Sequence, residues 1–426
     1  MGYANPAQIN DGIHIRLFAR AFIIDDDTNR FVFVNTDLGM ATQLVVERLK
    51  ILYGGIYTTE NVIISGTHTH SAPGGYIQYL FYQVTSLGFI DQAYESIVYG
   101  IVESIIRAHN SMTTGRLYYS SGELLNSSIN RSPSAYLNNP EEERAKYQYD
   151  TDKTMTLLKF VAEDGTDLGM VNWFAVHPTS MNNTNTLVSG DNKGYAEQLF
   201  EKAMDPGSLA GKSNCGDVSP NTDGPKCQDT GLPCDILTST CGGRVKLCYA
   251  AGPGKDMEES TKIIGTRQFE KAVTRTCRPA LGFSFAAGTT DGPGVFDFTQ
   301  GMTEDNPFWT KIVNFVVETD PEQIVCHHPK PILLDTGNYH RPYEWTSDIV
   351  ETQVARVGQF VIAAVPGEFT TMSGRRMRDK LSSVFAEEGV PDIVPVIAGL
   401  SNVYTHYITT FQEYAIQRYE GASTIF

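Results

Sequence analysis

Three histidines and a glutamate are the residues of this chain best suited to chemistry. His68 and His70 lie two positions apart, while His177 and Glu368 come from distant parts of the sequence. Imidazole nitrogens and carboxylate oxygens are common zinc ligands, and catalytic zinc sites keep an open position beside them. Side chains at i and i+2 of an extended chain point to the same side. These residues predict a zinc site; the alternative is a set of surface or loop histidines with a capping glutamate.

Each of these polar clusters directly follows an apolar run that favours a β-strand. The four runs are residues 62–64, 171–176, 360–365 and 393–400, and the last precedes a tyrosine- and histidine-containing segment, 401–407. In α/β proteins, binding sites gather beyond the carboxyl ends of strands. The four loops are therefore expected to converge on one pocket.

The remaining periodicity predicts an α/β fold in which mixed β-sheets are flanked by helices. Apolar runs at 31–34 and 155–161 favour further strands. Helices are expected at 42–52, at 371–385 and in a segment that Asp91 can cap. The metal site is expected at the carboxyl ends of the strands. No linker-like composition divides the chain, so one elaborated domain is expected.

Other polar residues carry weaker signals. Ser219 lies in the sequence GDVSPN, which does not match G-x-S-x-G and has no base at a fixed spacing, so a turn serine is the default and a nucleophile the alternative. Arg131 follows Asn130 in a turn-like segment and by default is a solvated charge. Periodicity alone cannot choose among the tyrosines near the end of the chain, which are Tyr404, Tyr407, Tyr414 and Tyr419.

The overall charge and hydropathy limit the partners. The chain has 426 residues, and 33 Lys plus Arg against 49 Asp plus Glu give 33 − 49 = −16, which argues against a nucleic-acid partner. Hydrophobic residues make up 41% and provide material for a packed core. No apolar run approaches the roughly 20 residues of a membrane-spanning helix.

The cysteines favour an oxidising compartment. Four of them recur every seven residues, at Cys227, Cys234, Cys241 and Cys248, without the close pairs of a structural zinc site, so disulfides are favoured over metal. Glycosylation sequons begin at Asn126, Asn130 and Asn182. The first residues lack the basic start and apolar stretch of a signal peptide. An exported protein is therefore expected whose leader is missing from this chain.

Several longer motifs resemble the neutral ceramidase family. They cover nearly the whole chain in the family's order, and they are GTHTHSAPGG from Gly66, NRSP from Asn130, FAVHPTSMNN from Phe174, GDVSPN from Gly216, PGEFTTMSGRR from Pro366 and NVYTHYITT from Asn402. The resemblance implies zinc-dependent hydrolysis of the amide bond of ceramide (N-acylsphingosine) to sphingosine and a free fatty acid. It places this reaction in an α/β catalytic domain.

The same resemblance assigns roles to individual residues. As zinc ligands it implies His68, His177, Glu368 and Tyr407. His70 is implied to contact the substrate, and Arg131 and Tyr419 to hydrogen-bond it near the metal. Ser219 matches the serine assigned in the family as the active-site nucleophile.

Amide hydrolysis explains why such a set is needed. Zinc can polarise the amide carbonyl and lower the pKa of a bound water to about 7. We favour this water as the attacking group, although Ser219 could attack directly or position water and substrate. The two alkyl chains of ceramide require an apolar groove, and a membrane surface is the expected source of substrate without being spanned. The acidic charge argues against adhesion to anionic lipid.

The chain also departs from the family pattern. It begins inside the family's domain, so that a first strand and any leader are absent, and it ends before the immunoglobulin-like C-terminal domain. Between 203 and 214 and between 266 and 277 it is shorter than the family. Residues 1–426 are therefore expected to be the N-terminal catalytic domain with these segments missing. The full-length protein is expected outside the cell or at its surface.

The resemblance further suggests three disulfides, Cys227–Cys241, Cys234–Cys248 and Cys277–Cys326, with Cys215 outside them. Two alternatives to an active ceramidase remain at this point. One is a non-catalytic or folding-defective fragment that at most binds lipid. The other is a zinc hydrolase of a different ester or amide, because sites at strand ends support many reactions.

Overall fold

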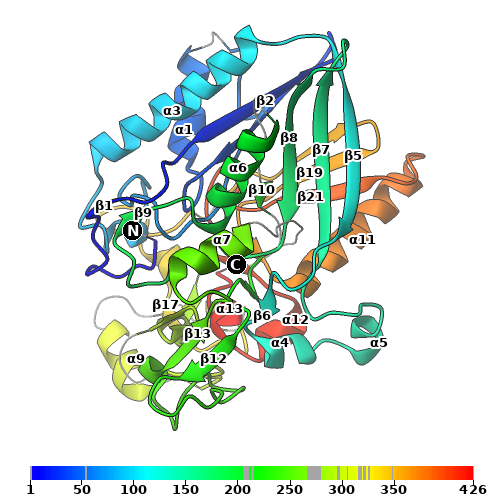
Figure 1. Ribbon diagram of the computed structural model, residues 1–426. Helices are drawn as coiled ribbons and strands as arrows, with labels where there is room; N and C mark the ends of the chain where they lie inside the picture. Colours follow the sequence, from blue (N-terminus) through cyan, green and yellow to red (C-terminus); the bar gives the residue numbers. More distant parts are fainter. Residues whose placement is uncertain are drawn as a thin grey trace.

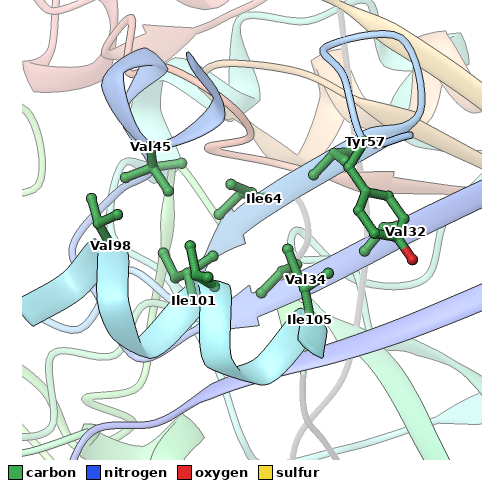
Figure 2. Packing of buried hydrophobic residues seen from close by; sticks show 11 residues of the cluster. Val32, Val34, Val45, Tyr57, Ile64, Val98, Ile101 and Ile105 are labelled. Carbon is green, nitrogen blue, oxygen red and sulfur yellow. The ribbon is translucent and has the colours of Figure 1, made fainter. Parts of the chain in front are cut away.

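Strand β3 (Arg30–Thr36) shows how the sequence builds the core of the protein. Successive side chains of a strand point to opposite faces. Val32 and Val34 pack on one face, against helix α3 (Asp91–Asn110) (Figure 2). Phe33 packs on the other face. The strand is buried on both faces, which explains its continuous apolar sequence.

One β-layer is formed by two three-stranded sheets that lie side by side. β3 pairs antiparallel with β2 (Ala19–Asp25) and parallel with β4 (Val62–Gly66). The second sheet has the order β18 (Gln353–Val357), β19 (Phe360–Ala364) and β21 (Val394–Ala398). A bridge between Ser65 and Ser401 joins the two, and the Asn402 N–H donates to the Ile64 carbonyl at 2.9 Å. The carboxyl ends of β4 and β21 are thereby held together.

The second β-layer has the strand order β10 (Gly211–Lys212), β8 (Asp167–Phe174), β7 (Thr154–Ala162) and β5 (Gly115–Glu123). It packs face to face on the first layer. Trp173 of β8 lies between Phe33 of β3 and Phe360 of β19, with ring centroids 5.7 and 5.5 Å apart. Aromatic and aliphatic burial at this interface stabilises the packing of the two layers.

Helices cover both outer faces, which gives four layers in the order helix, sheet, sheet, helix (Figure 1). On one side, α1 (Gln43–Leu52) and α3 cover β2, β3 and β4, while α11 (Thr371–Glu387) covers β19 and β21. On the other side, α6 (Asp191–Met204) and α7 (Met257–Gly265) pack on Phe174 and Val176. The expected mixed sheets flanked by helices are confirmed.

Short ladders extend from the ends of the two layers. The two-stranded pairs are β1 (Gly12–Ile13) with β9 (Leu187–Val188), β6 (Ile129–Asn130) with β11 (Val218–Ser219), β12 (Gly224–Cys227) with β13 (Cys248–Ala251), β14 (Leu281–Gly282) with β17 (Ile332–Leu334), β15 (Gly288–Thr289) with β16 (Gly292–Pro293), and β20 (Glu368–Phe369) with β22 (Tyr407–Ile408). The remaining helices are α2 (Leu80–Gln83), α4 (Pro133–Leu137), α5 (Glu141–Arg144), α8 (Phe283–Ala286), α9 (Pro307–Asn314), α12 (Phe411–Ala415), α13 (Tyr419–Ala422) and the 3-10 helices η1 (Val245–Leu247) and η2 (Thr336–Asn338).

This computed structural model describes residues 2–52, 55–204, 211–212, 215–265, 280–294, 298–304, 306–314, 319, 323–324, 327–347 and 349–425. Every strand and helix predicted from periodicity is present within two residues of its expected bounds, except that the strand expected at 171–176 runs from Asp167 to Phe174. Asp91 is not the cap of α3: the cap position is Ile90, and Asp91 is the first helical residue, where its charge favours the helix N-terminus. Among the described helices, none combines the length and the apolar character needed to cross a membrane.

The disulfides Cys227–Cys241 and Cys234–Cys248 are both present. The third expected bridge, Cys277–Cys326, lies outside the described residues. Of the three sequon asparagines, Asn126 is exposed, whereas Asn130 is buried and its amide donates to the Asp217 carboxylate at 2.8 Å. Glycosylation at Asn130 is therefore incompatible with the folded structure.

Candidate metal centre

The four strand ends do bring their polar residues together. His68 follows β4, His177 follows β8, and Glu368 begins β20 a few residues after β19. β20 pairs in parallel with β22, and the register places Tyr407 opposite Glu368. The candidate centre is therefore assembled from both β-layers.

The cluster is tight and almost completely buried. The two oxygens of Glu368 are shared between two histidines, since Oε1 lies 3.0 Å from His68 Nε2 and Oε2 lies 3.0 Å from His177 Nε2. His70 Nε2 is 3.1 Å from His68 Nε2. His68 and Glu368 are 4% and 1% exposed, and His177 is fully buried, whereas His70 is half-buried.

Hydrogen bonds on the far side of each ring fix which nitrogen faces the centre. His68 Nδ1 is 2.6 Å from the Gly39 carbonyl, and His177 Nδ1 is 2.6 Å from the Cys215 carbonyl. A carbonyl only accepts, so each Nδ1 carries a proton, and in the neutral ring it is Nε2 that presents its lone pair. Both lone pairs then face a carboxylate oxygen. Such a set of acceptors fits a cation, and the second hydrogen bond on each ring is the usual support of a metal-binding histidine.

His68 and His70 do not converge through an extended backbone, so the expectation from their i, i+2 spacing is wrong. β4 ends at Gly66, and His68 has φ of +68°, so the chain from 68 to 70 is not extended. A left-handed histidine is uncommon and costs energy, which the surrounding contacts must offset. The turn nevertheless brings the two rings together, with centroids 4.6 Å apart. His68, His70 and His177 offer nitrogens within 4.8 Å of one another, so the geometry also admits His70 as a ligand.

Two tyrosines border the carboxylate and differ in their contacts. The Tyr404 hydroxyl donates to Glu368 Oε1 at 2.7 Å. The Tyr407 hydroxyl lies 3.5 Å from His177 Nε2 and accepts from Arg131 Nη2 at 3.1 Å. Burial, together with the charge of Glu368, raises the pKa of both phenols well above the ordinary value. Both phenols therefore keep their protons at physiological pH, although the Arg131 charge beside Tyr407 opposes the rise of its pKa.

Arg131 is buried beside this centre rather than solvated. Its Nη2 donates to the Gly216 carbonyl at 2.7 Å as well as to Tyr407. Its Nε lies 2.9 Å from Glu420 Oε1 and its Nη1 lies 3.2 Å from Asp291 Oδ2. Burial disfavours the cation, but the negative charges of Glu420 and Asp291 outweigh this effect and hold the pKa of Arg131 well above its ordinary value. The guanidinium is a fixed positive charge with four of its hydrogen bonds made inside the protein.

Ser219 lies in strand β11, not in a turn. Its hydroxyl donates to Asp291 Oδ1 at 2.7 Å, and it reaches the centre through Asp291 and Arg131. Tyr419, at the start of α13, packs against Tyr407 with ring centroids 5.3 Å apart. All eight residues selected from the sequence therefore lie in one connected cluster.

Sequence reasoning missed three members of this cluster, Tyr404, Glu420 and Asp291. Tyr404 belongs to the NVYTHYITT motif and Glu420 directly follows Tyr419, and only their contacts distinguish them from their neighbours. Asp291 stands in a glycine-rich turn with no preceding apolar run, so no pattern in the sequence marked it.

The family model for the neutral/alkaline non-lysosomal ceramidase N-terminal region matches residues 1–274 and 270–426. Among curated proteins, a neutral ceramidase of Drosophila melanogaster is 47% identical and neutral ceramidase 1 of Arabidopsis thaliana is 44% identical. Each match covers 100% of this chain, and 69% and 70% of the relatives.

Solved structures are similar over the same extent. One described as "Ceramidase complexed with C2" superimposes with a TM-score of 0.83 at 36% identity and covers 100% of this chain and 69% of that chain. The neutral ceramidase of Pseudomonas aeruginosa gives a TM-score of 0.78 at 34% identity, with 100% and 68% covered.

Proposed function

Because the chain belongs to the neutral/alkaline non-lysosomal ceramidase family, we propose that it hydrolyses the amide bond of ceramide to sphingosine and a free fatty acid in a zinc-dependent reaction. The observation that carries this proposal is the buried cluster in which the Nε2 atoms of His68 and His177 both face the Glu368 carboxylate. Two neutral imidazoles and a carboxylate are the donor set of catalytic zinc sites.

The proposed ligands are His68, His177, Glu368 and Tyr407. The ring orientations support the first two, since their Nδ1 protons are held by backbone carbonyls. Tyr407 is preferred to Tyr404 because its hydroxyl lies 3.5 Å from His177 Nε2 and accepts from Arg131, whose positive charge favours a phenolate ligand, whereas the Tyr404 hydroxyl donates to Glu368. Bound zinc would supply a Lewis acid that polarises the amide carbonyl and lowers the pKa of water to about 7.

The other residues have binding and orienting roles in this proposal. His70 is half-buried, and its ring packs on Tyr3 with centroids 4.6 Å apart, so it is placed to meet a substrate at the open side of the centre. Arg131 and Tyr419 border Tyr407, and the Arg131 guanidinium stabilises negative charge there. Ser219 presents its oxygen while donating its proton to Asp291.

The two disulfides support export to an oxidising compartment, and the exposed Asn126 remains a glycosylation site in this proposal. The substrate would be taken from a membrane surface, with no nucleic-acid partner.

Turnover of a short-chain fluorescent ceramide by the purified, zinc-loaded protein tests the proposal. We expect release of fatty acid by the wild type and a loss of activity of at least a hundredfold in Glu368→Gln. Glu103→Gln, which removes a half-buried carboxylate paired with Arg107 on α3, is the matched control. A folded, zinc-loaded wild type that leaves ceramide intact would refute the assignment. Cleavage of simple esters but not of ceramide would instead indicate another zinc hydrolase.

A further inference from the structure

The carboxylate of Asp291 accepts hydrogen bonds from three other segments of the chain. Its Oδ1 accepts from the Ser219 hydroxyl at 2.7 Å and from the Asn221 amide at 2.8 Å. Its Oδ2 accepts from Arg131 Nη1 at 3.2 Å and from the Thr179 hydroxyl at 3.4 Å. Asp291 is 3% exposed. A buried carboxylate with this many donors is a fixed acceptor.

The local sequence explains how Asp291 is held. It lies in the tight turn between β15 and β16, where Gly288 has φ of +65°. A Cβ on Gly292 would lie 2.9 Å from the ring of Tyr3, so only glycine allows this close approach. The turn packs against Tyr3, whose ring also contacts His70. This packing holds the Asp291 carboxylate beside the candidate centre.

The contact with Asp291 restricts what Ser219 can do. A hydroxyl has one proton to donate and two lone pairs. An ionised carboxylate cannot donate, so the Ser219 proton is committed to Asp291. One lone pair accepts from the Asn221 N–H at 3.1 Å. What remains for a ligand is a single lone pair, and both roles open to Ser219, attack or orientation of the substrate, use a lone pair.

We propose that Asp291 is a positioning residue that acts through Ser219, by directing the serine proton away from the substrate so that the oxygen meets it as an acceptor or nucleophile. The same carboxylate, through Oδ2, keeps Arg131 in place beside Tyr407. This inference rests on the proposed amidase activity.

A double-mutant cycle tests it. Asp291→Asn offers Ser219 an N–H donor in place of one acceptor, which would release the serine proton. We expect kcat on ceramide to fall about 10- to 100-fold, the usual effect of losing a supporting residue behind a site, while zinc content stays at the wild-type level. Ser219→Ala should lower kcat at least as much. In the Ser219→Ala background, Asp291→Asn should then have little further effect, because the group it positions is gone.

Asp167→Asn, which removes a carboxylate from the surface pair with Lys159, is the control and should keep wild-type kcat. If Asp291→Asn does not fold, Asp291→Glu keeps the charge, displaces the carboxylate by one methylene, and enters the same cycle. Losses that multiply in the double variant, or a Ser219→Ala variant as active as wild type, would overturn the role of Asp291. Absence of turnover by the zinc-loaded wild type would instead overturn the proposed function.

Discussion

Replacing Arg131 by methionine should be among the most destabilising single changes near the candidate centre. The guanidinium is 3% exposed and is shared by Glu420 and Asp291, which are 2% and 1% exposed at the side chain. Methionine has a similar length but leaves both carboxylates buried without their cation. Breaking a buried ion pair from one side costs about 3–5 kcal/mol, because an uncompensated charge remains.

Arg131→Lys separates charge from geometry. Lysine keeps the positive charge but loses the planar fork that reaches Glu420, Asp291 and Tyr407 together. Losing one charge-assisted hydrogen bond costs about 1.5–3 kcal/mol, so this variant should lie between wild type and Arg131→Met.

The assay is denaturant unfolding followed by tryptophan fluorescence. The matched control is Arg107→Met, since Arg107 Nε lies 2.8 Å from Glu103 but is 78% exposed. An exposed i,i+4 pair contributes about 0.3–0.5 kcal/mol. The refuting result is an Arg131→Met variant as stable as Arg107→Met, which would mean that the two carboxylates are solvated or protonated.

Two further predictions concern the backbone and the pH dependence of stability. Gly216→Ala would place a Cβ 3.0 Å from the carbonyls of Glu368 and Phe369, so we expect weaker zinc binding and a loss of about 1–3 kcal/mol. Gly122→Ala, where no atom lies within 4 Å, is the control, and equal zinc affinity in the two variants would contradict the reasoning. Burial raises the pKa of Asp191 from 3.8 to about 7. The folded state then binds the Asp191 proton more tightly than the unfolded state does. The stability that this protonated carboxyl contributes is therefore present below the unfolded pKa of 3.8 and is lost as the pH rises to about 7. Asp191→Asn should therefore lose less stability than wild type between pH 4 and 7 in denaturant titrations, and parallel curves would refute this.

The layered fold could be predicted from the sequence because its signals are local. Alternating contacts at Val32, Phe33 and Val34 require only the two-residue repeat of a strand. The apolar runs 62–64 and 360–365 placed His68 and Glu368 just beyond strand ends. Which sheets stack on one another is decided by contacts such as Trp173 with Phe360, which are distant in sequence and follow no spacing rule.

The finer parts of the site could not be predicted because they also depend on contacts between residues that are distant in sequence. The left-handed backbone of His68 depends on tertiary contacts that a sequence does not display. Tyr404 and Tyr407 are chemically identical, and only the directions of their hydrogen bonds distinguish them. Asp291 reaches Arg131 across 160 positions from a glycine turn, a pairing fixed by the packing of Gly292 on Tyr3.

Zinc content of the purified chain tests the central claim most directly. We expect roughly one zinc per chain in the wild type and loss of zinc in His68→Ala and in Glu368→Ala. His340→Ala, at an exposed position, should retain it. Unchanged metal content in both site variants would contradict the claim that these strand-end loops hold a single ion.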